Sequence, residues 1–365
     1  MPDANSRRAR VIAFYLPQFH PIPENDRWWG RGFTEWANVA KAKPLFRGHE
    51  QPILPGELGF YDLRVPETRE AQAELARESG VAAFCYYHYW FGGGRRLLER
   101  PFNEVLQSKR PDFPFCLCWA NESWTGIWHG SPGVTLAEQT YPGALDYEAH
   151  FAVLLPAFFD PRYLRIDGKP LFVIYRPFDI PDLSAMAARW QELARQAGLP
   201  GLHLVLHQYD LYSPHHDATI FGGYLTPRLR ARDNPLLRRN LVARLAAWTR
   251  KLRGHPTVLD YEKAVEPMTA MLPDHPIPHY PCVVSNWDNT ARSGRNGLVL
   301  RGSNPEKFRV HLRRAIARVS DRAPQDRIIF LKSWNEWAEG NFVEPDARFV
   351  RGYLDVIEQE TRGAA

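Results

Sequence analysis

Eight short apolar runs recur along the chain, and most alternate with segments whose apolar positions recur at helical spacing. Because these runs are apolar throughout rather than alternating with polar residues, they are typical of parallel strands buried on both faces. The predicted strands cover residues 11–16, 81–90, 114–120, 171–175, 202–207, 218–221, 281–286 and the apolar run that begins at Arg327.

Helical segments with recognisable ends lie between most of the predicted strands. The first runs from Pro66 to Gly80, with proline at its start and glycine past its end, the usual positions of these residues around a helix. The alternation favours parallel βαβ units, and eight strands favour a single α/β domain, a (β/α)8 or TIM barrel with long aromatic-rich loops. A doubly wound sheet is the alternative, but no glycine-rich nucleotide motif follows any predicted strand. The predicted helices cover residues 66–80, 97–109, 144–159, 182–197, 305–319 and 347–361.

The length of 365 residues suits one barrel of this kind. We expect a disordered N-terminus at residues 1–9, a barrel over residues 10–362, and a basic helical insertion or arm at residues 225–260. Between Arg228 and Arg253, nine basic residues stand against one acidic residue, with leucines at helical spacing. Such an arm either packs on the barrel with a solvated basic face or contacts an anionic membrane or lipid-linked glycan.

Composition narrows the possible classes of protein. A hydrophobic fraction of 44% and a charged fraction of 24% are typical of a soluble globular protein. The net charge of +5 is too small to indicate a nucleic-acid surface. We find no signal peptide and no apolar run of the roughly 18 residues that a transmembrane helix needs. The four cysteines lie in apolar runs and are predicted to be reduced, buried thiols, which favours the cytoplasm: Cys85, Cys116, Cys118 and Cys282.

Polar and aromatic residues gather at the C-terminal ends of the predicted strands, where the active site of such a barrel lies. Aromatic residues make up 13% of the chain and include 12 tryptophans, which can form core or flat surfaces for sugar rings. The candidate substrate-binding residues are Tyr15, Gln18, His20, Trp36, His88, Trp90, Asn121, Glu122, Trp124, Arg176, Gln208, Trp287, Asp288, Trp334, Asn335 and Trp337.

The last strand end carries the strongest chemical signal, because Glu336 and Glu339 stand three residues apart between tryptophans. Cleavage of a glycosidic bond needs two carboxyl groups at one cavity, one to protonate the departing oxygen and one to act as base or nucleophile. The indoles of Trp334 and Trp337 would raise one pKa and offer stacking faces. A helix-capping or solvated pair is the alternative.

Most other candidates also have a structural alternative. Asn121 and Glu122 could fix a loop, Arg176 could form an ordinary ion pair, and His88 could be a core histidine. The His215-His216-Asp217 run has metal-capable residue types, but they are adjacent and lack a clear third ligand. We therefore expect neither a metal nor a cofactor.

Several long motifs resemble the WbsX family, the glycoside hydrolase family 99-like proteins of polysaccharide biosynthesis loci. The resemblance runs from about residue 10 to 357 and implies a (β/α)8 barrel. The motifs are Tyr15-Leu-Pro-Gln-Phe-His-Pro-Ile-Pro-Glu-Asn-Asp26, Trp28-Trp-Gly, Gly32-Phe-Thr-Glu-Trp36, Leu58-Gly-Phe-Tyr-Asp-Leu63, Cys85-Tyr-Tyr-His-Tyr-Trp90, Cys116-Leu-Cys-Trp-Ala-Asn-Glu122, Trp287-Asp-Asn-Thr-Ala-Arg292 and Trp334-Asn-Glu-Trp-Ala-Glu-Gly340.

The resemblance also implies chemistry, since the hydrolase family cleaves α-mannosidic linkages with retention through a Glu-x-x-Glu pair. Glu336 would be the base that deprotonates the sugar's own 2-hydroxyl, giving a 1,2-anhydro intermediate. Glu339 would protonate the leaving oxygen and then act as base for the acceptor. The chain departs from the family after Thr125: it reads Gly126-Ile-Trp-His129 where the family usually has two basic residues, a tryptophan and an acid.

The sequence thus predicts a retaining glycoside hydrolase-like enzyme that acts on α-linked, mannoside- or rhamnoside-like glycans. Its expected partner is an oligosaccharide or polysaccharide, not nucleic acid. The hydrolase-like enzyme could also act as a transglycosylase. One alternative is a glycosyltransferase of lipopolysaccharide, O-antigen or other surface polysaccharide assembly. A nucleotide-sugar transferase commonly shows an Asp-x-Asp metal site, which we do not find. A non-catalytic glycan-binding barrel is the third possibility.

Overall fold

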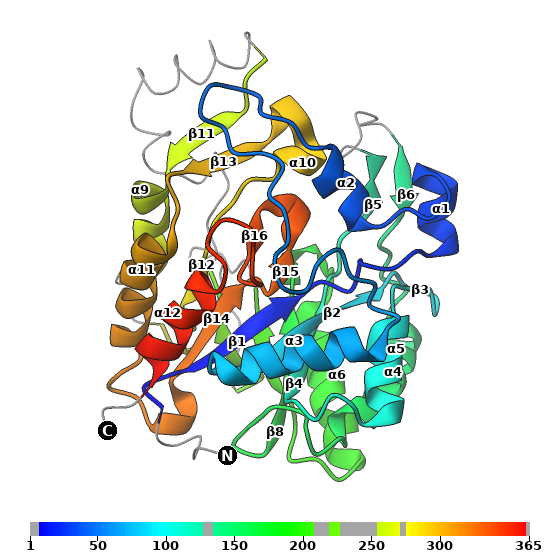
Figure 1. Cartoon of the computed structure of the whole chain (residues 1–365). Helices are drawn as coiled ribbons and strands as arrows, with labels where there is room; N and C mark the ends of the chain where they lie inside the picture. Colours follow the sequence, from blue (N-terminus) through cyan, green and yellow to red (C-terminus); the bar gives the residue numbers. More distant parts are fainter. Residues whose placement is uncertain (1–6, 127–133, 208–218, 227–253, 271–274, 363–365) are drawn as a thin grey trace, which may run out of the picture.

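The computed structural model describes residues 7–126, 134–207, 219–226, 254–270 and 275–362. Its centre is a sheet of parallel strands, which Figure 1 shows curling around the middle of the molecule. These strands are β1 (Arg10–Tyr15), β2 (Val81–Trp90), β4 (Phe115–Trp119), β8 (Lys169–Ile174), β9 (His203–Leu206), β10 (Phe221–Tyr224), β12 (Cys282–Val284) and β14 (Ile328–Lys332).

The strands neighbour one another in the order β10-β9-β8-β4-β2-β1-β14-β12, with every pairing parallel. The two ends of this order meet just before β12. There Tyr224 forms a parallel bridge with His279, and the backbone N of Tyr280 donates to the Tyr224 carbonyl at 2.9 Å. Eight parallel strands in a ring confirm the predicted (β/α)8 barrel.

The sixth strand differs most from its prediction, because it covers Phe221–Tyr224 rather than residues 218–221. Two glycines lie in this strand, where neighbouring rings approach its backbone closely. A Cβ on Gly222 would lie 2.5 Å from the His203 ring, and one on Gly223 would lie 2.2 Å from the Tyr280 ring. Glycine in a strand often marks such a close approach.

Helices cover the outside of the ring, as the alternating pattern predicts (Figure 1). The last helix begins at Gly352 rather than residue 347, because the Asp346 carboxylate accepts from the backbone N of Arg348 and Phe349 and forms a turn first. The outer helices are α3 (Pro66–Glu78), α4 (Arg100–Ser108), α5 (Ala144–Phe158), α6 (Leu183–Gln196), α11 (Pro305–Ala317) and α12 (Gly352–Thr361).

Several short elements above the barrel were not predicted. The segment between β1 and α3, residues 16–65, is the first long loop. It was expected to be irregular but contains α1 (Pro23–Trp29) and α2 (Glu35–Lys41). A second, parallel two-stranded sheet pairs β11 (Thr257–Asp260) with β13 (Leu298–Arg301). The basic stretch from Arg228 to Arg253 lies outside the described residues, and only the edges of the predicted arm at residues 225–260 are described.

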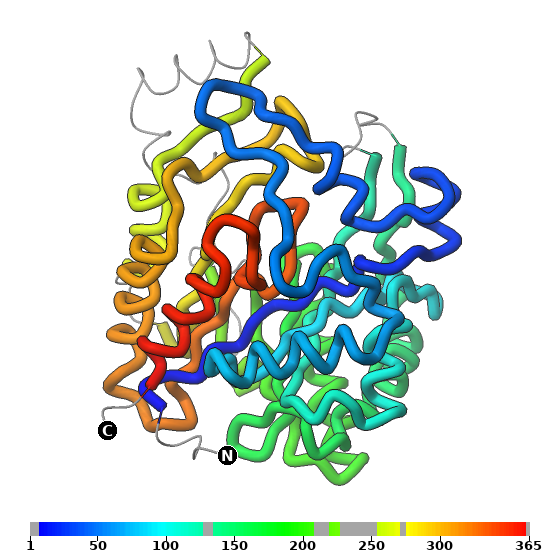
Figure 2. The backbone as a smooth tube through the Cα atoms, viewed as in Figure 1, coloured from blue at the N-terminus to red at the C-terminus, as the bar shows by residue number. Residues whose placement is uncertain are grey.

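The predicted burial of the cysteines is confirmed, since all four are buried free thiols. At the other end of the barrel the first and last described segments meet (Figure 2), where Arg8 N donates to the Thr361 carbonyl at 3.0 Å. The chain is therefore already placed at Arg7 and Arg8, inside the range expected to be disordered. The remaining part of that expectation, residues 1–6, lies outside the described residues.

A tight hairpin follows β14, formed by β15 (Asn335–Glu336), a 3-10 turn (Trp337–Glu339) and β16 (Asn341–Phe342). Just beyond it, the buried carboxyl of Glu344 joins the hairpin to α3 and the first loop. It accepts from Tyr61 Oη at 2.8 Å, Gln72 Nε2 at 2.6 Å and Trp337 Nε1 at 2.6 Å. Burial raises the pKa of Glu344 to about 7, although these donors favour the carboxylate.

We expect Glu344→Gln to remove a pH-dependent loss of stability. A carboxyl whose pKa is raised on folding stabilises the fold at low pH and loses that contribution as the pH rises through the folded pKa. From the ordinary value of 4.5 to about 7, the wild type should lose about 3 kcal/mol of unfolding free energy relative to the variant. Denaturant unfolding of both proteins across this range measures the effect, and a constant difference would contradict it.

Candidate active site

The hairpin after β14 folds both glutamates back over the same strand end. Ser333 Oγ fixes the hairpin, accepting from Glu336 N at 3.0 Å and donating to the Asn341 carbonyl at 2.7 Å. Gly340 makes the turn with φ +59, and a Cβ there would meet Asp288 at 2.9 Å. The position therefore favours glycine for both its backbone angle and its lack of space.

The carboxyl groups of Glu336 and Glu339 lie beside each other, with only 4% and 8% of the two residues exposed. Glu336 acts on Glu339 both through its charge and through a side-chain hydrogen bond. Glu339 Oε1 accepts from Arg292 Nη1 at 2.6 Å, and Asn341 Nδ2 lies 3.4 Å from Glu336 Oε2. The structure thus brings the two predicted catalytic residues together.

The pKa of Glu339 is raised above the ordinary glutamate range. Burial is the main cause, and the Glu336 carboxylate beside it adds to the rise. The cations Arg292 and Lys332 oppose the shift without reversing it. A carboxyl whose pKa is raised is better suited than an ordinary glutamate to act as a general acid.

Arg292 and Glu35 belong to this cluster but were not predicted as site residues. Arg292 lies on α10 (Thr290–Ser293), and its Nε donates to Glu35 Oε2 of α2 at 2.9 Å. Both residues occur in the motifs of the family resemblance. Nothing in a single sequence pairs an acid with a base 257 positions away, so only the fold reveals the contact.

Lys332, the last residue of β14, was also missed, although it is buried against both carboxylates. Its Nζ lies 3.4 Å from Tyr175 Oη, 5.3 Å from the Tyr175 ring centre and 5.4 Å from the Trp287 ring centre. Burial lowers the pKa of Lys332, but Tyr175, Glu336 and Glu339 outweigh burial, so its pKa lies above the usual range. The site therefore contains a second fixed cation.

Aromatic side chains and one amide surround this charged cluster. Tyr87 packs against Tyr175, and its pKa is raised well above the usual range by burial and by Glu336. Gln18 Nε2 lies 3.4 Å from Tyr89 Oη, and the Trp124 ring lies 5.2 Å from the Tyr89 ring. Of the predicted residues, Gln18, Trp124 and Trp287 thus lie near or around the pair, whereas the two tyrosines of β2 were not predicted.

Other candidates lie on the opposite sides of their strands, beneath the helices. His88 Nε2 lies 2.9 Å from His150 Nε2 of α5, and the Trp90 ring stacks on the same histidine. Tyr15 Oη donates to Gln72 of α3 at 2.7 Å, and Trp334 packs on Phe84 with no exposed surface. These residues pack in the layer between the strands and the outer helices.

A further group of candidates fixes strand ends and loops through hydrogen bonds. Asn335 accepts from Leu16 N at 2.7 Å and donates to the Leu16 carbonyl at 3.1 Å. Asn121 makes the same pair of contacts with the backbone of Arg176, at 2.8 and 2.7 Å. Because both ends of each amide are occupied, these side chains join adjacent strand ends.

Three more candidates have partners within the protein. Trp36 Nε1 donates to the Tyr61 carbonyl at 2.7 Å, and Trp337 Nε1 donates to Glu344. Asp288 Oδ2 lies 2.7 Å from His49 Nε2 and 2.8 Å from Gln51 Nε2, while its Oδ1 accepts from Thr290. These contacts tie the first long loop to the ends of β12 and β14.

The remaining candidates lie at the edge of the site or outside the described residues. Arg176 Nε pairs with Glu122 Oε2 at 2.7 Å, and both side chains are partly exposed. Burial lowers the pKa of His20 to about 4, and Asp62, Arg64 and Arg100 face it. Gln208 lies outside the described residues, as do the 215–217 run and most of the departing loop after Thr125.

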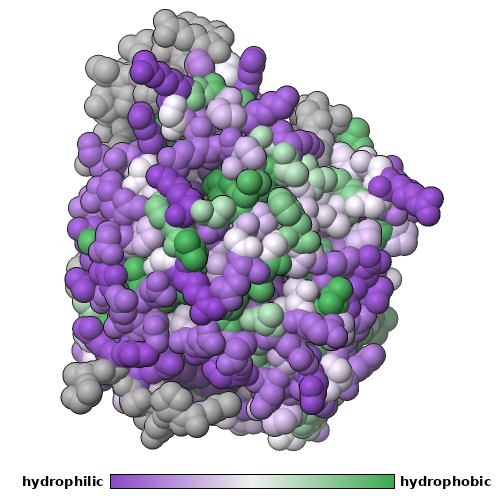
Figure 3. Space-filling view, in the orientation of Figure 1, coloured by the Kyte–Doolittle hydropathy of each residue, from purple (hydrophilic) through white to green (hydrophobic). Residues whose placement is uncertain are grey.

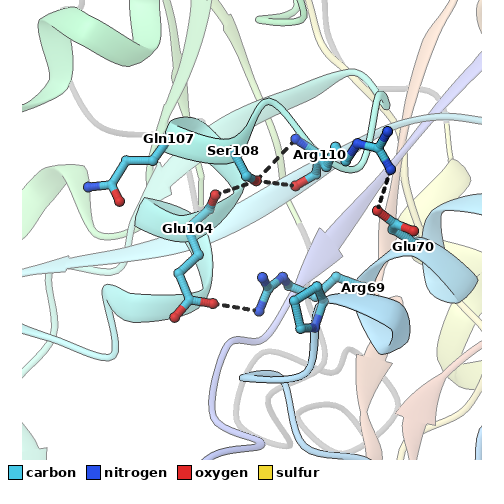
Figure 4. Close-up of a pocket in the computed structure, with 7 residues that line it drawn as sticks. Arg69, Glu70, Glu104, Gln107, Ser108 and Arg110 are labelled. Carbon is cyan, nitrogen blue, oxygen red and sulfur yellow. Dashed lines mark hydrogen bonds and ion pairs between the residues drawn. The ribbon is translucent and has the colours of Figure 1, made fainter.

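A cavity away from the two glutamates lies between α3 and α4, in the outer helix layer (Figure 4). Most of its charged side chains pair with one another, as in the 2.9 Å contact between Arg69 and Glu104. No group of three possible metal ligands occurs among the described residues.

None of the described helices combines the length and apolarity needed to cross a bilayer. The face in Figure 3 is mostly hydrophilic, with small apolar groups near its middle.

Known proteins share both the sequence and the fold. The family described as Glycosyltransferase WbsX matches residues 11–357. Proteins named "Uncharacterized protein WxcX" from two strains of Xanthomonas campestris pv. campestris are 39% identical over 356 residues, which is 96% of this chain. The match covers 49% of each relative, so the chain spans about half the length of the curated relatives it matches.

Two solved structures resemble this one at low sequence identity. A "Glycoside hydrolase-like protein" has a TM-score of 0.59 at 14% identity, over 98% of this chain and 94% of that chain. The GH99 endo-alpha-mannosidase from Bacteroides thetaiotaomicron has a TM-score of 0.57 at 15% identity, over 96% of each chain. These likenesses support the barrel fold, and the match over residues 11–357, with the 39% identity to WxcX, shows that the chain belongs to the WbsX family.

Proposed function

We propose that the protein is a carbohydrate-active enzyme that breaks or exchanges α-linked glycosidic bonds with retention, using Glu336 and Glu339. The observation that carries the proposal is the burial of these two carboxyl groups side by side at the C-terminal end of β14. Carboxyl groups that act on each other directly suit the short separation of retaining glycosidases better than the wider separation of inverting ones. The arrangement therefore favours the retaining mechanism.

The mechanism assigns different steps to the two carboxyl groups. Glu336 removes the proton of the sugar 2-hydroxyl while O2 attacks C1, and protonated Glu339 gives its proton to the departing glycosidic oxygen. The product of this step is a 1,2-anhydro sugar. Glu339 then deprotonates the acceptor, water or another hydroxyl, which attacks C1, while O2 regains its proton from Glu336. The raised pKa of Glu339 supports the role of first proton donor.

The charges around the pair favour an uncharged bond as the reacting group. Arg292 and Lys332 are the cations nearest the pair, and Glu35, Glu336 and Glu339 are the facing acids. Two cations thus stand against three acidic side chains, so the cluster has no surplus of positive charge. A nucleotide-sugar diphosphate would need a surplus of positive charge there.

A glycosyltransferase of surface polysaccharide assembly is the second candidate, and the description of the family favours it. The same pair could transfer a glycosyl unit from one glycan to another without a nucleotide donor. A glycan-binding barrel without catalysis is the third candidate. The buried Glu339 with its raised pKa argues against it, because sugar binding alone needs no such acid.

We expect the protein to cleave α-mannosyl or α-rhamnosyl aryl glycosides, with kcat about 10²–10⁴-fold lower in Glu336→Gln and Glu339→Ala. Release of the aryl group measures the rate, and a parallel assay offers nucleotide sugars with a glycan acceptor. Glu360→Gln is the matched control, because Glu360 is also buried but pairs with Arg309 and Arg313 under the outer helices. Transfer only from a nucleotide donor would contradict the proposal, and binding without turnover would favour the third candidate.

We expect the two tryptophans beside β12 and β14 to behave differently. Trp287 is partly exposed next to Lys332, so Trp287→Ala should remove a stacking face worth about 1 kcal/mol and raise KM roughly fivefold. Trp334 is enclosed by the outer layer, so Trp334→Phe should lower Tm and leave KM unchanged. Steady-state kinetics and thermal melts separate the two effects; a raised KM in Trp334→Phe alone would reverse the assignment.

A further inference from the structure

Arg292 is shared between two acids that come from opposite ends of the chain. Its Nη1 donates to Glu339 Oε1 at 2.6 Å, and its Nε donates to Glu35 Oε2 at 2.9 Å. Only 13% of the Arg292 side chain, 10% of Glu339 and 6% of Glu35 is exposed. Since water screens these contacts weakly, each charge strongly affects the other two.

The guanidinium gives one hydrogen bond to each of the two acids. Glu339 receives one hydrogen bond, from Nη1, rather than the two parallel bonds of a bidentate arginine–carboxylate pair. The remaining donor, Nη2, is buried and forms no hydrogen bond with any part of the chain that the structure describes. Glu35 therefore shares with Glu339 a cation that also lies within reach of the Glu336 charge.

The surrounding elements hold this arrangement in place. Glu35 is the first residue of α2, and its backbone N donates to the Gln18 carbonyl at 3.4 Å. The adjacent Trp36 packs on Trp337 of the hairpin, with ring centres 5.6 Å apart. The short helices α2 and α10 and the turn of the hairpin pack against one another. Glu35 is thus a fixed part of the site.

The direction in which Glu35 shifts the pKa of Glu339 follows from the charges around Arg292. A full ion pair with Arg292 would favour the ionised form of Glu339, which cannot donate a proton. The carboxylate of Glu35 counters that pull by holding Arg292 and by repelling a second negative charge. The other charged groups facing Glu339 are Glu336 and Lys332, and both are present in all variants used below.

We propose that Glu35 is a positioning residue that, by holding Arg292, keeps Glu339 able to act as proton donor. This inference rests on the proposed function, in which Glu339 protonates the departing oxygen. It assigns a role to the first long loop, because α2 supplies the charge that prepares an acid more than 300 positions later for its task. Arg292 is then the element through which the loop acts.

The first test compares pH profiles of kcat/KM for the aryl glycoside. Glu35→Gln should move the alkaline limb, where Glu339 loses its proton, to lower pH by about one unit. Arg292→Met should move the same limb to higher pH, because it removes the cation. KM should change little in Glu35→Gln, and Glu360→Gln, which removes a buried carboxylate elsewhere, should leave the limb in place.

The decisive result is that the alkaline limb moves to lower pH in Glu35→Gln and to higher pH in Arg292→Met. If Glu35 only supported the fold, Glu35→Gln would lose activity without moving the limb, while Arg292→Met would still move it to higher pH because Arg292 contacts Glu339 directly. A shift to higher pH in Glu35→Gln would contradict the predicted direction. Either outcome would overturn the proposal. Thermal melts accompany each profile and show whether lost activity reflects unfolding.

A second test needs no turnover and separates this proposal from the proposed function. The unfolding free energy of each protein is compared with that of its Glu339→Gln version across pH. Because burial raises the pKa of Glu339, the protein with Glu339 should lose relative stability as the pH rises through the folded pKa. In the Glu35→Gln background this loss should end at a lower pH, and in Arg292→Met at a higher pH.

The two tests then have distinct failures. Absence of glycoside cleavage with the expected shifts in stability would contradict the proposed function and leave the effect of Glu35 on Glu339 established. Cleavage without any shift in either test would do the reverse, showing that Glu35 does not affect the proton of Glu339.

Discussion

The site depends on one electrostatic constraint: two glutamates are buried side by side in the hairpin after β14. Two adjacent negative charges with little water would be costly, so the pair holds a proton or faces cations. Here both solutions are present, since Glu339 has a raised pKa while Arg292 and Lys332 lie against the pair. The cations are in turn restrained by Glu35 and by the rings of Tyr175 and Trp287.

Many of the polar side chains at the strand ends fix the positions of the residues in this cluster. Asn335 and Asn121 each join two neighbouring strand ends through both sides of an amide, a role that carboxylates or hydroxyls could not fill in the same way. Asp288 anchors the first long loop through His49 and Gln51. Catalytic groups need positions fixed to fractions of an ångström, and such supporting contacts provide them.

The description of the family names a glycosyltransferase, and the mechanism that we propose can accommodate either transfer or hydrolysis. In that mechanism Glu339 becomes a base after the first bond breaks and can activate whichever hydroxyl enters. The loops around the pair would then decide whether water or a sugar enters, and part of the loop after Thr125 is where this chain departs from its family pattern. On this proposal the pair of glutamates determines which bond reacts, and the loops determine the acceptor.

The sequence by itself determined the barrel, the family and the identity of the carboxylate pair. Continuous apolar runs between helices leave few folds that bury both faces of every strand, and Glu336 and Glu339 are local neighbours whose proximity needs no long-range contact. Tertiary structure alone decided which side chains meet the pair. In strands that are apolar on both faces, no alternation shows which way Tyr87 or His88 points. Likewise, Glu35, Arg292 and Lys332 meet only when the ring closes.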